Sequence, residues 1–366
     1  MTENNIKKAF KNYTYTVKEE SRSRVKFNKF LANPMSSFVI MAVALIILQL
    51  LSMIPNFIIS TSVMSALGMT VIYSIISIGF CLLLGYSGLA SLGTAGFIGV
   101  GSYIAYFCFA EWGLPYIVCL IMTLAVSIVL GVAVGFISLR IEGIYLAIVT
   151  LGLAEILRNA LQAIRSTINI SMRDIKLFGI YFPKAAVFFL LVAMFFLLIV
   201  ITINLINSPT GRAMLAMKNS TAAAQAYGIS LMRYRLLAFV LSTIYASIAG
   251  LLYMMYIRSI STSMSTLLKL ATSLNILGAV IIGGTKSIWG VTLGTFLIYG
   301  LDSLVLQNIA FFRNNPTFVS LFIGLLIILV VMFYPGGLAQ LGIQIKQWTK
   351  KLIKKRREAK YGKDVG

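Results

Sequence analysis

Ionisable side chains within apolar runs are the first residues to consider for chemistry, because burying a charge in a membrane is expensive. Glu155 and Arg158 lie in the run LAIVTLGLAEILRNAL. Three residues apart on a helix, they share one face and can pair. A structural ion pair near the membrane boundary is the first interpretation, and a role in gating is the alternative.

The sequence offers little support for a metal site or a phosphate-binding loop. The chain has no histidine, and its three cysteines stand in apolar runs without CxxC spacing, so neither a metal site nor a disulfide framework is expected. GAVIIGGTKS (278–287) resembles a phosphate loop only superficially, because Thr285 and not lysine follows Gly284. With Glu155 paired, little remains for a proton relay. We therefore expect no enzyme activity and no cofactor in this chain.

Composition then gives the elements that must hold these residues. Of 366 residues, 59% are hydrophobic and 11% charged, with a mean hydropathy of +0.93. No charged residue occurs between Lys29 and Glu111. The fold class expected is an all-α polytopic membrane protein. Much of the net charge of +21 comes from basic residues in the two tails, which favours contact with membrane lipid headgroups over nucleic acid.

Apolar runs of spanning length predict about ten transmembrane segments (8–10), with both termini cytoplasmic. The boundaries are 35–60, 62–84, 86–108, 115–139, 143–164, 185–207, 236–257, 270–284, 288–306 and 317–334. The pair 270–284 and 288–306 fits two short spans or a re-entrant hairpin. The domain division is a basic cytoplasmic tail (1–34), a membrane domain (35–340) with a cytoplasmic loop at 208–235, and a second basic tail (341–366).

The loop at 208–235 is the most informative polar segment. The stretch from Arg212 to Ala226 contains no proline or glycine, with Pro209 near its start and Gly228 as a stop, which predicts one helix. A short basic helix on the cytoplasmic face fits a docking element for a partner protein. An ordinary interfacial helix lying on lipid is the alternative.

The uncharged stretch GYSGLASLGTAGFIGVGSYIAY (85–106) has membrane-helix length but six glycines, which are poor helix formers. Small residues recur at i+4 in a stripe, broadened by further glycines. The stripe fits static close packing, or a helix that bends or slides beside a translocation path. The residues assigned to path or packing are Ser87, Gly88, Ser91, Thr94, Ala95 and Gly99.

Five collinear motifs carry a resemblance to a known family. They are GYSGLASLGTAGFIGVGSY (85–103), LRIEGIYLAIVTLGLAEILR (139–158), SPTGRAMLAMKNSTAAAQAYGIS (208–230), RLLAFVLSTIYASIAGLLY (235–253) and LGAVIIGGTKSIWGVTLG (277–294). Over about residues 40–340 the chain resembles the M-type permease subunits of bacterial branched-chain amino acid ABC importers.

The resemblance implies a multi-pass protein of the bacterial inner membrane. Its implied partners are a homologous second permease subunit, two cytoplasmic ATP-binding subunits and an extracytoplasmic solute-binding protein. ATP hydrolysis would then occur in the separate ATPase subunits. The 208–235 segment would be the coupling helix that enters a groove on an ATPase subunit. The residues assigned to coupling are Gly211, Arg212, Lys218, Ala222, Ala223 and Gly228.

Two departures from the family pattern bear on partners and cargo. Ser220, Thr221 and Gln225 stand where the family commonly has acidic residues, and STINISMRDIK replaces a glycine-rich stretch after Arg158. An apolar amino acid suits an uncharged path, with Ser87, Ser91 and Thr94 as candidate partners for its zwitterionic head. Nucleosides, urea or amides are alternative cargoes, and an ATP-independent pore or secondary carrier is the alternative class.

Overall fold

The computed structural model describes residues 34–52, 61–138, 143–171, 176–177, 180–181, 183–261, 268–304, 309, 311–312, 315–334 and 336–340. The chain forms two compact units, Met1–Ile47 and Leu48–Gly366. Within the first unit, residues 34–47 form the beginning of helix α3. All packing described below lies within the second unit. Almost the whole of the predicted tails 1–34 and 341–366 falls outside the described residues.

The described residues are predominantly helical, which confirms the predicted all-α class. The helices are α3 (Pro34–Ser52), α4 (Thr61–Cys81), α5 (Thr94–Tyr106), α6 (Tyr116–Ser138), α7 (Ile144–Ile164), α8 (Lys184–Asn207), α9 (Pro209–Asn219), α10 (Thr221–Ala226), α11 (Leu231–Ile257), α12 (Leu270–Gly283), α13 (Ile288–Thr295), α14 (Leu301–Leu304) and α16 (Pro316–Phe333). Three π-helical turns extend α4, α5 and α13: η1 (Leu82–Tyr86), η2 (Phe107–Glu111) and η4 (Phe296–Gly300).

Six helical segments in the described ranges are long and apolar enough to cross a membrane. They are Met35–Ser52, Ser62–Tyr86, Tyr116–Ile137, Tyr145–Ile164, Lys184–Asn207 and Leu231–Ile257. Shorter apolar helices cover Leu270–Gly283, Ile288–Leu304 and Leu321–Val330. This supports a multi-pass membrane protein, while the total of about ten spans and the cytoplasmic placement of the termini stay predictions.

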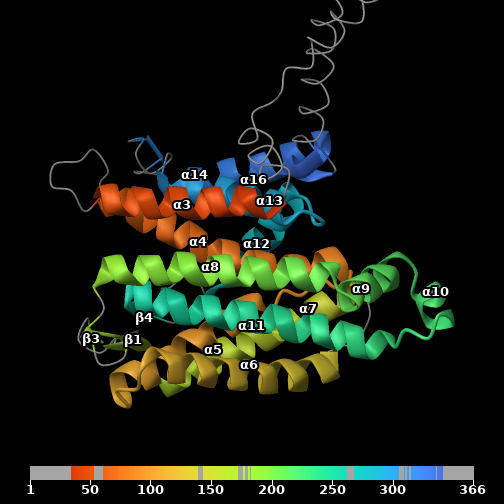
Figure 1. Cartoon of the computed structure of the whole chain (residues 1–366), viewed down its shortest axis with the longest axis horizontal. Coiled ribbons are helices and arrows are strands. Elements are labelled where there is room, and N and C mark those ends of the chain that lie inside the picture. Colours follow the sequence, from red (N-terminus) through yellow and green to blue (C-terminus); the bar gives the residue numbers. More distant parts are fainter. Residues whose placement is uncertain are drawn as a thin grey trace, which may run out of the picture. The chain divides into compact units, whose positions relative to one another are not determined.

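Helix α11 lies at the centre of the second unit, where it packs against α4, α5 and α6 (Figure 1). Glycines allow backbones to touch at its crossing with α5: a Cβ added at Gly101 would lie 1.9 Å from the carbonyl oxygen of Ser247, and one at Gly250 would lie 2.1 Å from that of Ile98. The Ser102 hydroxyl donates a hydrogen bond to the Gly250 carbonyl at 2.9 Å. Small residues thus serve close helix packing here, as they do in membrane proteins generally.

The prediction of one continuous helix over 86–108 is wrong. Residues 87–93 are not helical, and α5 begins at Thr94. Gly88 adopts a left-handed backbone with φ of 75°, and the Ser91 hydroxyl accepts a hydrogen bond from the Gly93 amide. These local interactions offer the backbone an alternative to the helix. The predicted small-residue stripe is therefore split: Ser87 and Ser91 precede α5, whereas Ala95 and Gly99 lie on it.

The prediction of one helix over 212–226 is also wrong. Ser220 has an extended backbone, with φ of −157°, and it ends α9 and begins α10. Its hydroxyl accepts a hydrogen bond from the Ala223 amide at 3.2 Å, which is N-capping geometry. An absence of glycine and proline does not ensure a continuous helix, because a serine that caps the next turn competes with the helical backbone.

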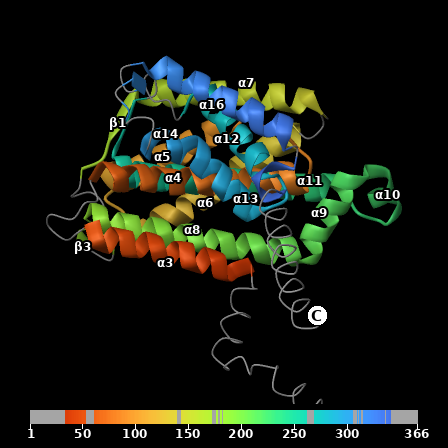
Figure 2. The same cartoon turned by 90° about the horizontal axis from the view of Figure 1, so that it is seen from above.

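The two ends of the bundle differ in their secondary structure. Short strands β1 (Thr167–Asn169) and β4 (Ser259–Ser261) pair antiparallel, as do β2 (Lys176–Leu177) and β3 (Ile180–Tyr181). Both views place β1 and β3 at one end, and α9 with α10 at the opposite end (Figures 1 and 2). The β1–β4 pairing therefore joins the residues that follow α7 to those that follow α11.

Candidate functional site

The segment between α8 and α11 begins and ends with specific caps. Ser208 accepts a hydrogen bond from the Gly211 amide at 3.3 Å, and Pro209 occupies the first turn of α9. At the other end, the Gly228 amide donates to the Gln225 carbonyl and the Ile229 amide donates to the Ala224 carbonyl. With Gly228 at φ of 77°, this is a Schellman motif. The helices are thus defined at both ends by local chemistry.

Two of the predicted coupling residues make contacts within this chain. A Cβ added at Gly211 would lie 2.4 Å from the carbonyl oxygen of Ile206, so only glycine fits this turn. The Arg212 guanidinium donates to the Asn207 carbonyl at 2.9 Å, where it caps the end of α8. By contrast, Ala222 and Ala223 are exposed on α10. The predicted set therefore divides into residues that hold the segment and residues that present a surface.

Lys218 connects α9 to the membrane helices. Its ammonium group donates to the carbonyls of Gly85 at 2.7 Å and Leu84 at 3.2 Å. These carbonyls lie at the end of the α4–η1 helix, where a cation satisfies otherwise unpaired acceptors. Burial, with a smaller contribution from Lys286, lowers the pKa of Lys218. The lysine predicted to act in coupling is therefore bound to the end of α4–η1.

The turn between α12 and α13 also contacts the end of the α4–η1 helix, where Lys218 binds. The Tyr86 hydroxyl donates to the Lys286 carbonyl at 3.2 Å, and the Cys81 thiol donates to the Thr285 carbonyl at 3.2 Å. A Cβ added at Gly85 would lie 1.8 Å from the Thr285 carbonyl oxygen. The sequence reasoning missed this three-segment junction. The sequence feature that could have indicated this junction is Gly85, because the absence of a side chain permits the backbone contact.

The non-helical residues 87–93 are buried mostly within protein, and their polar groups find partners. The Leu92 amide donates to the Thr150 hydroxyl of α7 at 3.0 Å, and the Ala95 amide donates to the Ser273 hydroxyl of α12 at 3.1 Å. The Ser87 hydroxyl donates to the Leu83 carbonyl. Irregular backbone at membrane depth requires such satisfaction. Ser87 and Ser91 therefore already have hydrogen bonds within the chain.

The glycines of α5 face neighbouring helices. A Cβ added at Gly96 would lie 3.0 Å from the Cα of Ala154, and one at Gly99 would lie 2.8 Å from a methyl carbon of Leu161. Both contacts are with α7. At the site of Gly88, an added Cβ would approach the Lys218 stem at 3.2 Å. This geometry matches the packing interpretation of the small residues, and a role beside a path stays a prediction.

A small polar cavity adjoins the start of α5. Its volume is about 10 Å³, and its lining includes Ser91, Thr94, Ser242 and Thr243. That is space for about one water molecule, against roughly 300–1,000 Å³ for a ligand pocket. Two predicted path residues therefore meet here, but this cavity is too small to hold a cargo molecule.

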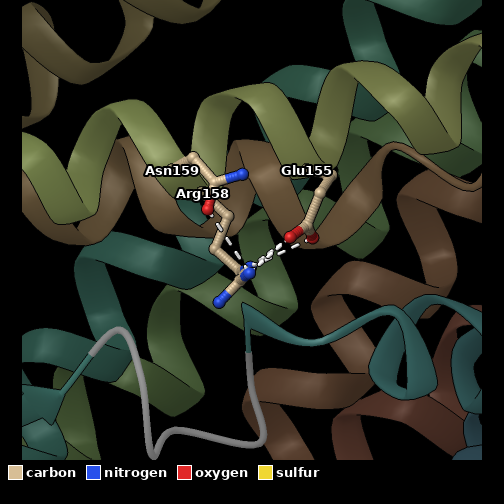
Figure 3. Close-up of polar contacts among 3 residues, drawn as sticks. All are labelled: Glu155, Arg158 and Asn159. Carbon is tan, nitrogen blue, oxygen red and sulfur yellow. Dashed lines mark hydrogen bonds and ion pairs between the residues drawn. The ribbon is translucent and has the colours of Figure 1, made fainter.

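Glu155 and Arg158 make the predicted pair on α7 (Figure 3). The Arg158 Nε donates to both carboxylate oxygens of Glu155, at 3.0 and 3.1 Å, and Nη2 also bonds Oε1. Arg158 Nη2 further reaches the amide oxygen of Asn159 at 3.4 Å. The predicted geometry is present, while its structural or gating role stays a prediction.

Among the described residues, no group of three histidine, cysteine, aspartate or glutamate side chains could hold a metal ion. Cys81, Cys108 and Cys119 are free and buried. The described residues include two ion pairs that are at least partly exposed, Glu155–Arg158 and Glu111–Arg165.

Comparison with known proteins finds a matching family model and several similar permeases. The family model described as "Branched-chain amino acid transport system / permease component" matches residues 62–331. The LivM permease proteins of the high-affinity branched-chain amino acid transport systems of Salmonella typhimurium and Escherichia coli are 30% and 29% identical to this chain. The matches cover 74% and 80% of this chain, and 68% and 74% of those proteins.

A permease with another named cargo also matches. The autoinducer 2 import system permease LsrC of Klebsiella pneumoniae is 31% identical over 36% of this chain and 37% of that protein. No solved structure matches the chain. The matching permeases and the apolar helices indicate a multi-pass protein of the bacterial inner membrane. The chain belongs to the branched-chain amino acid transport system permease family.

Proposed function

We propose that this chain is a membrane permease subunit of an ATP-driven importer that takes up branched-chain amino acids. The family match and the similarity to two LivM permeases over most of the chain support this assignment. Family membership also supports a transmembrane subunit that works with other subunits and is not itself an enzyme.

The single observation that carries the coupling role is the attachment of α9 to the bundle. Lys218 binds the carbonyls of Leu84 and Gly85, while the next helix, α10, exposes most of its surface. A partner that moves α10 would therefore move the end of α4–η1 with it. This is what coupling ATP hydrolysis to a membrane path requires.

The partners in this proposal are a homologous second permease, two cytoplasmic ATPase subunits and an extracytoplasmic binding protein. ATP binding and hydrolysis occur in the ATPase subunits, and no cofactor is needed in this chain. In this proposal the path runs between the two permeases, and the cavity beside Ser91 and Thr94 is far too small to hold an amino acid. The Lys218 contact transmits the ATPase movement to this path.

Co-purification tests the coupling assignment. We expect Ala223→Trp to reduce recovery of the ATPase subunits with the permease at least tenfold, because Ala223 is exposed on α10 and the bulky ring would obstruct docking. Ala110→Trp makes the same change at an exposed position near the opposite end, and recovery should be unchanged. Equal recovery of ATPase with both variants would contradict the docking assignment.

Uptake by the reconstituted complex tests the cargo. Leucine, isoleucine and valine should enter vesicles only with ATP and the binding protein. Uptake of nucleosides, urea or amides instead would replace the proposed cargo. Transport without ATP would contradict the importer class and favour a pore or secondary carrier.

A further inference from the structure

The Glu155–Arg158 pair stands near the middle of a membrane-length helix. Helix α7 runs from Ile144 to Ile164, so Glu155 lies about 16 Å from its start and about 14 Å from its end at 1.5 Å per residue. Glu155 is therefore distant from both ends of the helix, where headgroups usually solvate charges, while Arg158 lies about 9 Å from the end at Ile164.

The pair is nevertheless open on the surface of this chain. The side chains of Glu155 and Arg158 are 50% and 22% exposed. An arginine that faces hydrocarbon at the centre of a helix is costly, and such charges usually face a protein interior or a water-filled cavity. This part of α7 is therefore expected to face a wet path or another protein.

The turn of α7 that follows the pair lies close to the start of α12. Leu161, one turn beyond Arg158, and Leu268, just before α12, both approach the position of a Cβ at Gly99. Lys269 is the exposed N-cap of α12. A basic residue thus begins the helix that lies beside the last part of α7.

Arg158 keeps binding capacity while it is paired. Its bonds to Glu155 use Nε and Nη2, whereas a guanidinium has five N–H donors in all. Among the described residues, no bond to Nη1 is found, so its two N–H groups remain for another acceptor. The exposed carboxylate of Glu155 can likewise accept from an ammonium group. One site then offers a partner to each charge of a zwitterion.

We propose that Glu155 and Arg158 bind the zwitterionic head of the amino-acid cargo as it passes along α7. The cargo carboxylate bonds the Arg158 guanidinium, and its ammonium group bonds Glu155. Arginine suits this role because its planar fork matches a carboxylate. The inference rests on the proposed function and adds the part of the cargo that this chain recognises.

The test uses the complete importer in proteoliposomes, with leucine uptake, binding-protein-stimulated ATP hydrolysis and complex assembly measured together. We expect Glu155→Gln and Arg158→Gln each to lower leucine uptake at least tenfold, while assembly and stimulated ATP hydrolysis stay within twofold. Ile156→Ala, at an exposed position on the same helix, is the matched control and should keep normal uptake.

A charge swap separates cargo binding from a structural role. In Glu155→Arg with Arg158→Glu, the i,i+3 pair can re-form, but the two charges exchange places. Loss of uptake with normal assembly supports the site, because the bound zwitterion would be reversed. Restored uptake, or loss of permease assembly in the single variants, would overturn it in favour of a structural pair.

The unaltered complex tests the proposed function separately. If it carries another zwitterionic amino acid, the branched-chain cargo is wrong and the same variants test the pair with the cargo found. Uptake of uncharged solutes alone would overturn the pair inference as well.

Discussion

Helices α9 and α10 are neighbours in the chain and differ in almost every contact. In α9, Gly211, Met214 and Met217 are buried, and Lys218 binds the end of α4–η1. In α10 only Ala224 is buried, and the adjoining Tyr227 is 87% exposed. One helix is attached to the bundle and the other presents a surface. Helix α9 is therefore suited to transmit movement to the bundle, and α10 is suited to contact a partner.

The largest expected effect comes from a substitution at Gly85, where the end of the α4–η1 helix touches the turn between α12 and α13. Gly85→Leu would force side-chain atoms against the Thr285 carbonyl, which is backbone and lies 1.8 Å from the Cβ position. We expect loss of most folded protein, measured as recovery and thermal midpoint in detergent. Gly152→Ala is the control, since nothing lies within 4 Å of that position. Equal recovery of both variants would contradict a rigid junction.

The next effect tests the bond that joins α9 to the bundle. Lys218→Met keeps most of the side-chain stem and removes the donor to Leu84 and Gly85. We expect a loss of about 1.5–3 kcal/mol of stability, typical for a hydrogen bond to a charged group. Leucine uptake should fall at least fivefold while ATPase co-purification is retained. A variant that lost the ATPase but kept its stability would reverse the roles assigned to α9 and α10.

A substitution on the exposed surface beside α10 should leave stability almost unchanged and weaken partner binding. Tyr227→Ala removes a ring that is 87% exposed, so stability of the isolated chain should change by less than about 0.5 kcal/mol. If the ring contacts the proposed ATPase partner, co-purification should fall severalfold. Thermal unfolding and affinity recovery check the two halves of this prediction. A large loss of stability would show that α10 is not simply a presenting surface.

The smallest effect concerns pH. Burial lowers the pKa of Lys218 in the folded chain, whereas the unfolded side chain keeps its ordinary value near 10.4. Between these two pKa values the unfolded state binds more protons, so Lys218 makes stability rise with pH there. The thermal midpoint of the unaltered chain should rise relative to that of Lys218→Met as pH increases toward 10. A relative fall would contradict the direction of the shift.

Hydropathy and charge predicted the class of fold well, because a long apolar run has few stable forms other than a membrane helix. The ends of α8 and α11 were placed within about five residues for the same reason. Both failures came from serines and a glycine. Ser91, Ser220 and Gly88 act through local hydrogen bonds or backbone conformation, which periodicity does not represent.

The sequence predicted individual residues of the site better than it predicted which residues they contact. The i,i+3 spacing gave the Glu155–Arg158 pair, because both residues lie on one helix. Lys218 was named for coupling, but its partners Leu84 and Gly85 lie more than 130 residues away in the chain. Contacts between distant segments depend on how helices pack, and a single sequence carries little direct information about that.

The side chains that satisfy residues 87–95 also bear on how the protein is made. Thr150 binds the Leu92 amide from 58 residues further along the chain, and Ser273 binds the Ala95 amide from 178 residues further along. At about 5–20 residues synthesised per second, the second partner emerges roughly 9–36 s after Ala95. Until then the Ala95 amide lacks its final acceptor, and unpaired amides are costly in lipid. We therefore expect the packing of the start of α5 to be completed late in synthesis, after α12 has been made.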